Sequence, residues 1–145
     1  MKISFFTASM HRYPLEKSFE TAAKFGYDGI EIWGGRPHAL ASDMRPEDVE
    51  HINALSRKYK LPIVSFEPDM ANLLWRDQRW IDESIEYFKQ CLDLCKAIHC
   101  PYMVMAALQA SYGYSTDEDW AQFIKYMKVL AEYDETIDGP VMILE

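Results

Sequence analysis

Fourteen residues near the N-terminus read Gly26-Tyr27-Asp28-Gly29-Ile30-Glu31-Ile32-Trp33-Gly34-Gly35-Arg36-Pro37-His38-Ala39. They contain a turn, a short apolar strand with one carboxylate, and a glycine-rich exit loop. A glutamate within an apolar strand is costly to bury unless a partner compensates it, so Glu31 is either tied to a neighbour or part of a site. The glycines that follow allow the backbone to turn sharply towards a ligand.

Strand and helix patterns alternate on both sides of this stretch. Apolar spacing and helix-start signals predict helices that begin near Pro14, Pro46 and Trp80, and a fourth after the capping-box pair Ser115 and Glu118. A glycine at the C-cap position, Gly26, ends the first helix. The predicted strands are continuously apolar and lie at 3–8, 29–33, 62–67, 102–107 and 141–144. Such strands are typical of a parallel sheet that is buried on both faces.

This order predicts an α/β fold with about five strands and four helices in one domain spanning 1–145. An open doubly wound sheet has the same order of elements, but the first strand-to-helix turn, 9–14, lacks the glycine fingerprint of a dinucleotide-binding fold. A complete (β/α)₈ TIM barrel needs about 250 residues. The pattern therefore corresponds to the N-terminal part of such a barrel.

Composition and charge narrow the range of partners. The 145 residues include 23 acidic and 15 basic side chains, which gives a net charge of −8 and opposes binding to nucleic acid or anionic membranes. No apolar run approaches the roughly 20 residues that a membrane helix needs. Two of the three cysteines, Cys91 and Cys95, lie four apart on a predicted helix, which favours buried thiols over disulfides. We therefore expect a reducing, cytoplasmic location.

The run from Tyr27 to Ala39 resembles the sugar phosphate isomerase/epimerase families of the xylose-isomerase-like barrel superfamily. Its first part, Asp-Gly-Ile-Glu, is shared by many relatives, whereas the continuation from Trp33 is more specific and is most similar to the fructoselysine 3-epimerase group. The opening of the chain and the segment 141–145, Val-Met-Ile-Leu-Glu, also fit the family. The resemblance covers the whole chain but only the N-terminal part of the family barrel.

The resemblance implies a metal-dependent isomerase. In the family a divalent cation, commonly Mn²⁺, is held by Glu, Asp, His and Glu from strands five to eight, and two glutamates act as acid/base groups. By motif position Glu145 is the first ligand and a catalytic carboxylate, and the other ligands would come from strands beyond it. The cation polarises the sugar carbonyl and stabilises the enediolate that forms on proton removal. The implied reaction is C3 epimerisation of a ketose or ketosamine such as fructoselysine.

Five further residues are candidate contacts for a small-molecule sugar: Phe6, Glu31, Trp33, His38 and Glu67. Phe6 and Trp33 form either an apolar wall for the sugar or ordinary core. Glu31 either lines the site or is tied to a neighbour such as a lysine or arginine. His38 is expected to contact the substrate or a residue that does, and Glu67 is either a site residue or a turn residue. The apolar loop at 69–79 predicts a lid or pocket wall.

Two alternatives remain open. One is an isomerase of another free or phosphorylated sugar. The other is a noncatalytic half-barrel, because the chain lacks most of the ligands that the family uses. Its edge strands, at 3–8 and 141–145, would expose backbone donors and interior apolar side chains, so two copies would cover each other and form a homo-oligomer.

Overall fold

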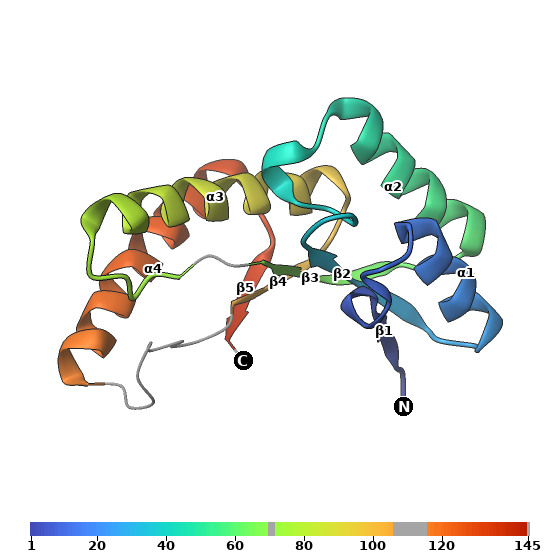
Figure 1. The fold of residues 1–145 in the computed structure, drawn as a ribbon, viewed down its shortest axis with the longest axis horizontal. Helices are drawn as coiled ribbons and strands as arrows, with labels where there is room; N and C mark the ends of the chain where they lie inside the picture. Colours follow the sequence, from blue (N-terminus) through green and yellow to red (C-terminus); the bar gives the residue numbers. More distant parts are fainter. Residues whose placement is uncertain (70–71, 106–115, 145) are drawn as a thin grey trace.

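The computed structural model describes residues 1–69, 72–105 and 116–144. Within these ranges strands and α-helices alternate, and short 3₁₀ helices follow the first two strands (Figure 1). The elements are β1 Ser4–Phe6, η1 Thr7–Met10, α1 Leu15–Lys24, β2 Gly29–Gly34, η2 Ala41–Asp43, α2 Pro46–Tyr59, β3 Ile63–Pro68, α3 Gln78–Ala97, β4 Tyr102–Met105, α4 Asp117–Ile137 and β5 Val141–Leu144.

The sheet order follows the chain order. Each strand pairs in parallel with the next, and the five strands lie in the order β1-β2-β3-β4-β5. A doubly wound sheet reverses its order at a switch point, whereas a (β/α)₈ barrel adds each strand beside the previous one. In Figure 1, α2 and α3 lie on the same side of the sheet. The predicted α/β fold, part of a TIM barrel with five strands and four helices, is confirmed.

The core lies between the sheet and the helices. Alternate strand residues point towards the helices, and four of them are fully or almost fully buried: Ile30, Ile32, Phe66 and Met103. Each helix contributes a buried apolar face against them, including Phe19 of α1, Ile52 of α2, Leu92 of α3 and Leu130 of α4. The residues between these strand positions point to the opposite face, which is the inner face of a barrel.

Local chemistry sets the helix ends. Gly26 has a φ of 75°, and the amides of Gly26 and Tyr27 donate to the carbonyls of Ala23 and Ala22 at 3.2 and 3.1 Å. This is the pairing of a Schellman motif, which ends α1 where the sequence predicts. Pro46 is the first residue of α2, where its missing N–H leaves no hydrogen bond unmade.

Several predicted boundaries differ from the structure by one or two residues. The first strand ends at Phe6 rather than at 8, because Thr7 begins a 3₁₀ helix and its hydroxyl accepts the Trp33 amide at 2.8 Å. The third helix, predicted to begin near Trp80, starts at Gln78, since the Asp77 carboxylate caps it by accepting the Arg79 amide.

The capping box of α4 lies one residue later than predicted. Thr116 and Asp119 form it, with the Thr116 hydroxyl accepting the Asp119 amide at 3.1 Å and the Asp119 carboxylate accepting the Thr116 amide at 2.9 Å. Ser115, the predicted cap, lies outside the described residues. The end of the predicted fourth strand, 106–107, also lies outside them.

The cysteines are buried thiols, as the sequence predicts. Cys91, Cys95 and Cys100 are all free. Burial raises the pKa of Cys91 to about 12, so this thiol is protonated at neutral pH. In the described ranges no helix is both long and apolar enough to cross a membrane.

Candidate active site

The inner face of the sheet carries a group of polar and aromatic side chains. Partners on adjacent parallel strands point to the same face. Glu31 of β2 pairs with Phe6 of β1 and with Ser65 of β3, and Trp33 pairs with Glu67. The residues that flank Glu31 are fully buried under the helices, so Glu31 and its partners face the other way. Four of the five candidate substrate contacts therefore share one face.

These four residues lie in two layers. Successive residues on the same face of a strand are about 6.6 Å apart, so Phe6 and Glu31 lie one layer below Trp33 and Glu67. In barrel enzymes the reacting centre lies at the carboxyl ends of the strands. Trp33 and Glu67 are therefore nearest to the expected mouth.

Glu31 is tied to a neighbouring strand by a hydroxyl. The Ser65 Oγ donates to Glu31 Oε2 at 2.5 Å, and Glu31 is half-buried. A neutral donor fixes one carboxylate oxygen without cancelling the charge. The sequence suggested a lysine or arginine for this role, whereas the structure places a serine hydroxyl there. Glu31 thus presents a carboxyl group on the inner face that can accept a hydrogen bond from a substrate hydroxyl.

Trp33 is held in place from three sides. Its amide donates to the buried Thr7 hydroxyl, and its ring makes edge contacts with the imidazoles of His11 and His38 at centroid distances of 6.1 and 5.9 Å. The next residue is Gly34, where an added Cβ would lie 2.7 Å from the Phe66 ring. At Gly35 an added Cβ would collide with the Trp33 ring, so close packing around the end of β2 restricts the direction of the indole.

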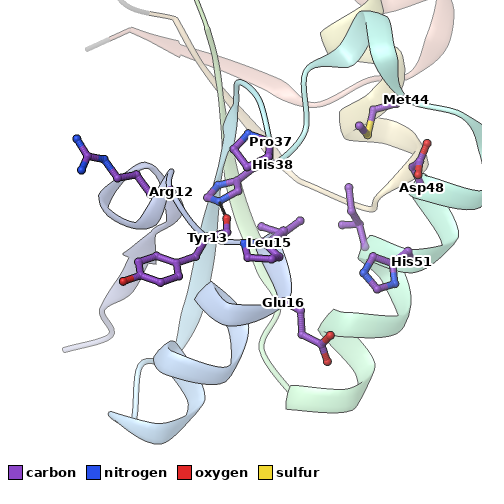
Figure 2. Close-up of a pocket in the computed structure, with 11 residues that line it drawn as sticks. Arg12, Tyr13, Leu15, Glu16, Pro37, His38, Met44, Asp48 and His51 are labelled. Atoms are coloured by element: carbon purple, nitrogen blue, oxygen red, sulfur yellow. Dashed lines mark hydrogen bonds between the residues drawn. The ribbon is translucent and has the colours of Figure 1, made fainter.

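His38 lies behind the indole rather than on the inner face. It is 4% exposed, and its Nε2 donates to the Tyr13 carbonyl at 3.0 Å (Figure 2). Burial lowers the pKa of His38 below its ordinary value of 6.5, so the ring is neutral at physiological pH. The same residue borders a cavity of about 520 Å³ between α1 and α2, with His51 on the opposite wall. This geometry favours a role for His38 in positioning the Trp33 indole.

A second cavity, of about 310 Å³, lies beside α3. Its wall consists of Leu40, Ser42, Asp69, Trp75, Trp80, Glu83, Ser84 and Tyr87. The sequence identified the loop that carries Trp75 as a pocket wall, and Trp75 does line this cavity, whereas Leu73 and Leu74 of the same loop are buried in the core. The helix residues Trp80, Glu83 and Tyr87 were missed, because helical spacing alone does not show that a loop packs beside them.

The described residues do not fit a divalent cation on their own. Among residues 1–69, 72–105 and 116–144, no three His, Cys, Asp or Glu side chains converge closely enough to hold a metal ion. The predicted ligand and catalytic residue, Glu145, lies outside the described residues. A metal site would thus need ligands beyond the described residues.

The fold and the inner face define a class of protein. A parallel sheet in chain order, with outer helices and carboxylates on its inner face, is part of an α/β barrel scaffold. The chain belongs to the Xylose isomerase-like TIM barrel family, whose sequence model matches residues 19–144.

Relatives of known name lie within the sugar epimerases. The chain is 36% identical over 149 aligned positions to fructoselysine 3-epimerase from Escherichia coli O157:H7 and from Shigella flexneri, and the match covers 100% of this chain and 54% of each relative. The chain therefore spans about half the length of these relatives.

Solved structures share the fold. A 3-keto-D-glucoside 4-epimerase, YcjR, from E. coli matches with a TM-score of 0.77 at 16% identity, over 99% of this chain and 55% of that one. The IolI protein with a bound zinc atom matches with a TM-score of 0.78 at 21% identity, over 99% and 51%. A D-psicose 3-epimerase matches with a TM-score of 0.78 at 14% identity, over 98% and 51%.

Proposed function

We propose that this chain supplies the N-terminal part of the active site of a sugar epimerase that inverts C3 of a ketose or ketosamine such as fructoselysine. The identity to the fructoselysine 3-epimerases along the whole chain supports this proposal. The observation that carries it is the inner face, where Trp33 and Glu67 share the upper layer above Glu31. An isomerase of another free or phosphorylated sugar is the alternative within the same class.

The inner face has the chemistry that a sugar needs. A sugar presents C–H groups on one face and hydroxyl groups at its edges. The indole of Trp33 offers a flat apolar surface for the C–H groups, and the carboxylates of Glu31 and Glu67 accept hydrogen bonds from hydroxyls. Because Thr7, His11 and His38 hold Trp33, the surface is formed before the sugar arrives. Phe6 extends the apolar surface below it.

In the proposed reaction a proton is removed from one face of C3 and a proton is returned to the opposite face. One carboxylate removes the proton from C3, next to the carbonyl, and leaves an enediolate, and a second carboxylate returns a proton to the opposite face. We propose Glu145, which follows Leu144 directly in the sequence, as one of these two carboxylates. A divalent cation, which we propose to be manganese, would have Glu145 as one ligand. No step proposed for the described residues involves the cation.

Isotope exchange and binding test this function in a complete barrel that contains this chain as its N-terminal part. With fructoselysine and Mn²⁺ in D₂O, we expect deuterium at C3 and the appearance of the 3-epimer by NMR, both reduced more than about 100-fold by Glu145→Gln. Glu132→Gln, an exposed carboxylate on α4, serves as the matched control and should change neither. Exchange with a free or phosphorylated ketose but not with fructoselysine would favour the alternative. The absence of both binding and exchange with all of these sugars would overturn the proposal.

We propose a noncatalytic half-barrel that pairs with a second copy as the candidate from another class. The observation that favours it is an apolar groove of about 600 Å³ between α4 and β5. Around it Val141, Leu144 and Trp120 are 59%, 54% and 46% exposed, which is unusual for clustered apolar side chains. A second copy would bury them.

For either candidate function we propose a reducing, cytoplasmic setting, without nucleic acid or membrane partners. The free thiols and the net charge of −8 support this proposal.

A further inference from the structure

The cavity of about 310 Å³ beside α3 combines two indoles with two carboxylates. Trp75 and Trp80 line it and remain 39% and 48% exposed. Single exposed apolar residues are common, but two tryptophans on the wall of one cavity form a surface that attracts a flat or cationic group. Asp69 and Glu83 lie on the same wall.

The charge of this cavity is negative. Among the described residues, its lining contains the two carboxylates and no lysine, arginine or histidine. Nearby arginines are engaged with other acids, since Arg76 pairs with Asp119 at 2.7 Å and Arg79 lies 3.6 Å from Asp77. The guanidinium of Arg79 also lies 5.1 Å over the Trp80 ring, so this indole already accepts a cation on one face. Indole faces beside uncompensated carboxylates are the usual recognition surface for organic ammonium groups.

The segment 72–77, which carries Trp75, is held in place by hydrogen bonds within the protein. The Gln122 side-chain amide, from α4, donates to the carbonyls of Leu73 and Trp75 at 2.7 and 3.1 Å. The Asn72 side chain accepts the Leu74 amide at 2.8 Å, and both leucines are buried. A wall that is already ordered costs less free energy to occupy than one that must be ordered by the ligand.

The cavity adjoins the mouth of the sheet through Tyr87. The Tyr87 hydroxyl donates to the Gly34 carbonyl at 3.0 Å and accepts the Asp69 amide at 3.4 Å. Gly34 directly follows Trp33, so the cavity lies next to the upper layer of the candidate active site. Burial raises the pKa of Tyr87 far above its ordinary value, and its hydroxyl thus remains a neutral donor.

We propose that this cavity binds the alkylammonium part of an amine-linked sugar while the sugar ring lies against Trp33. Asp69 and Glu83 supply the counter-charge, and Trp75 and Trp80 supply the aromatic wall. The assignment of the cation to a ketosamine rests on the proposed function, whereas the affinity of the cavity for an alkylammonium group does not.

A simple amine tests the cavity by itself. In ¹H–¹⁵N NMR titrations of the protein, n-butylammonium should shift the indole resonances of Trp75 and Trp80, and isosteric n-butanol should not. Glu83→Gln should weaken n-butylammonium binding about three- to tenfold, and added salt should weaken it further. Glu132→Gln, on the exposed side of α4, is the matched control and should bind as the unchanged protein does.

A second pair of variants removes an indole instead of a charge. Trp75→Ala should weaken n-butylammonium binding severalfold, whereas Trp120→Ala, at an indole of comparable exposure outside the cavity, should leave it unchanged. Preserved NMR dispersion confirms that both variants are folded. Equal binding of n-butylammonium and n-butanol, or binding that is insensitive to both Glu83→Gln and Trp75→Ala, would overturn the inference.

Fructoselysine separates this inference from the proposed function. Weaker fructoselysine binding in Glu83→Gln, with no C3 exchange in any variant, would support the cavity and contradict the epimerase. Turnover of fructoselysine with unchanged KM in Glu83→Gln and in Trp75→Ala would support the epimerase and contradict the cavity.

Discussion

Thr7 connects the first strand to the tryptophan of the candidate site. Its side chain is fully buried and its Oγ1 accepts the Trp33 amide at 2.8 Å. Thr7→Val keeps the shape of the side chain but leaves a buried N–H without an acceptor, which costs about 1–3 kcal/mol. We therefore expect the urea midpoint of unfolding to fall without a change in m-value.

Thr136→Val is the matched control, because the Thr136 hydroxyl lies on the exposed surface of α4 and donates only to the Tyr133 carbonyl. It should change the stability by less than about 0.5 kcal/mol. Equal effects of the two substitutions would show that the bond between Thr7 and Trp33 adds nothing to the fold.

His38 makes the stability of the fold depend on pH. Burial lowers its pKa below the ordinary 6.5, so the unfolded chain binds a proton more readily than the folded chain. The unfolding free energy should thus be unaffected by this residue above pH 6.5 and should fall as the pH drops below it. The slope for one proton is at most about 1.4 kcal/mol per pH unit.

Urea unfolding at several pH values between 5 and 7.5 measures this slope. His38→Gln, whose side-chain amide can also donate to the Tyr13 carbonyl, should flatten it, whatever its effect on absolute stability. His51→Gln, at an exposed position on α2, should keep the slope of the unchanged protein. A slope that persists in His38→Gln would assign the pH dependence to another group.

The candidate residues were predictable to different degrees. Glu31 was identifiable because a carboxylate in an apolar strand is costly to bury without a partner, and Glu67 because it lies at the end of a predicted strand. The partner of Glu31, Ser65, was not, since it lies 34 positions away and the β2–β3 register shifts between Ile30 and Glu31. Sequence spacing along one strand carries no information on such a cross-strand shift.

The N-terminus of α4 depends on its capping box. Thr116 and Asp119 exchange hydrogen bonds between side chain and backbone, and they satisfy amides that have no partner within the helix. Thr116→Ala removes the hydroxyl acceptor and should destabilise the protein by about 1 kcal/mol in urea or thermal unfolding. Thr136→Ala, near the other end of the same helix, should cost much less. A loss in Thr136→Ala as large as that in Thr116→Ala would contradict the capping role.

Helices were easier to predict than their limits. The apolar period of α3 places Ile81, Phe88 and Leu92 on one buried side, as the structure confirms. The predicted helix limits were wrong where a polar side chain can cap any of several backbone amides, as Asp77 does at the start of α3. The predicted end of the first strand was also wrong, because the hydroxyl of Thr7 accepts a hydrogen bond from the distant Trp33 amide. Neither choice is visible in the apolar period.

The sheet of the described chain is open at both edges. β1 and β5 each pair with one strand only among the described residues, and each neighbouring pair of the five strands is parallel. Tyr102 on β4 and its partner Val141 on β5 share the inner face and are 45% and 59% exposed. In a closed barrel such side chains fill the interior. The described chain therefore leaves uncovered apolar surface of the kind that drives association.

Self-association is the prediction that follows for the 145-residue chain. We expect light scattering at micromolar concentration to give twice the mass of one chain, because pairing through β5 and α4 would bury Val141, Leu144 and the surrounding groove. Val141→Glu places a charge on that surface in a protein that already carries −8, and it should weaken the dimer at least about tenfold. Val129→Glu, on an exposed part of α4 outside the groove, is the matched control and should leave the mass unchanged. A monodisperse monomer of the unsubstituted chain would contradict pairing, and a dimer that resists Val141→Glu would place the contact elsewhere.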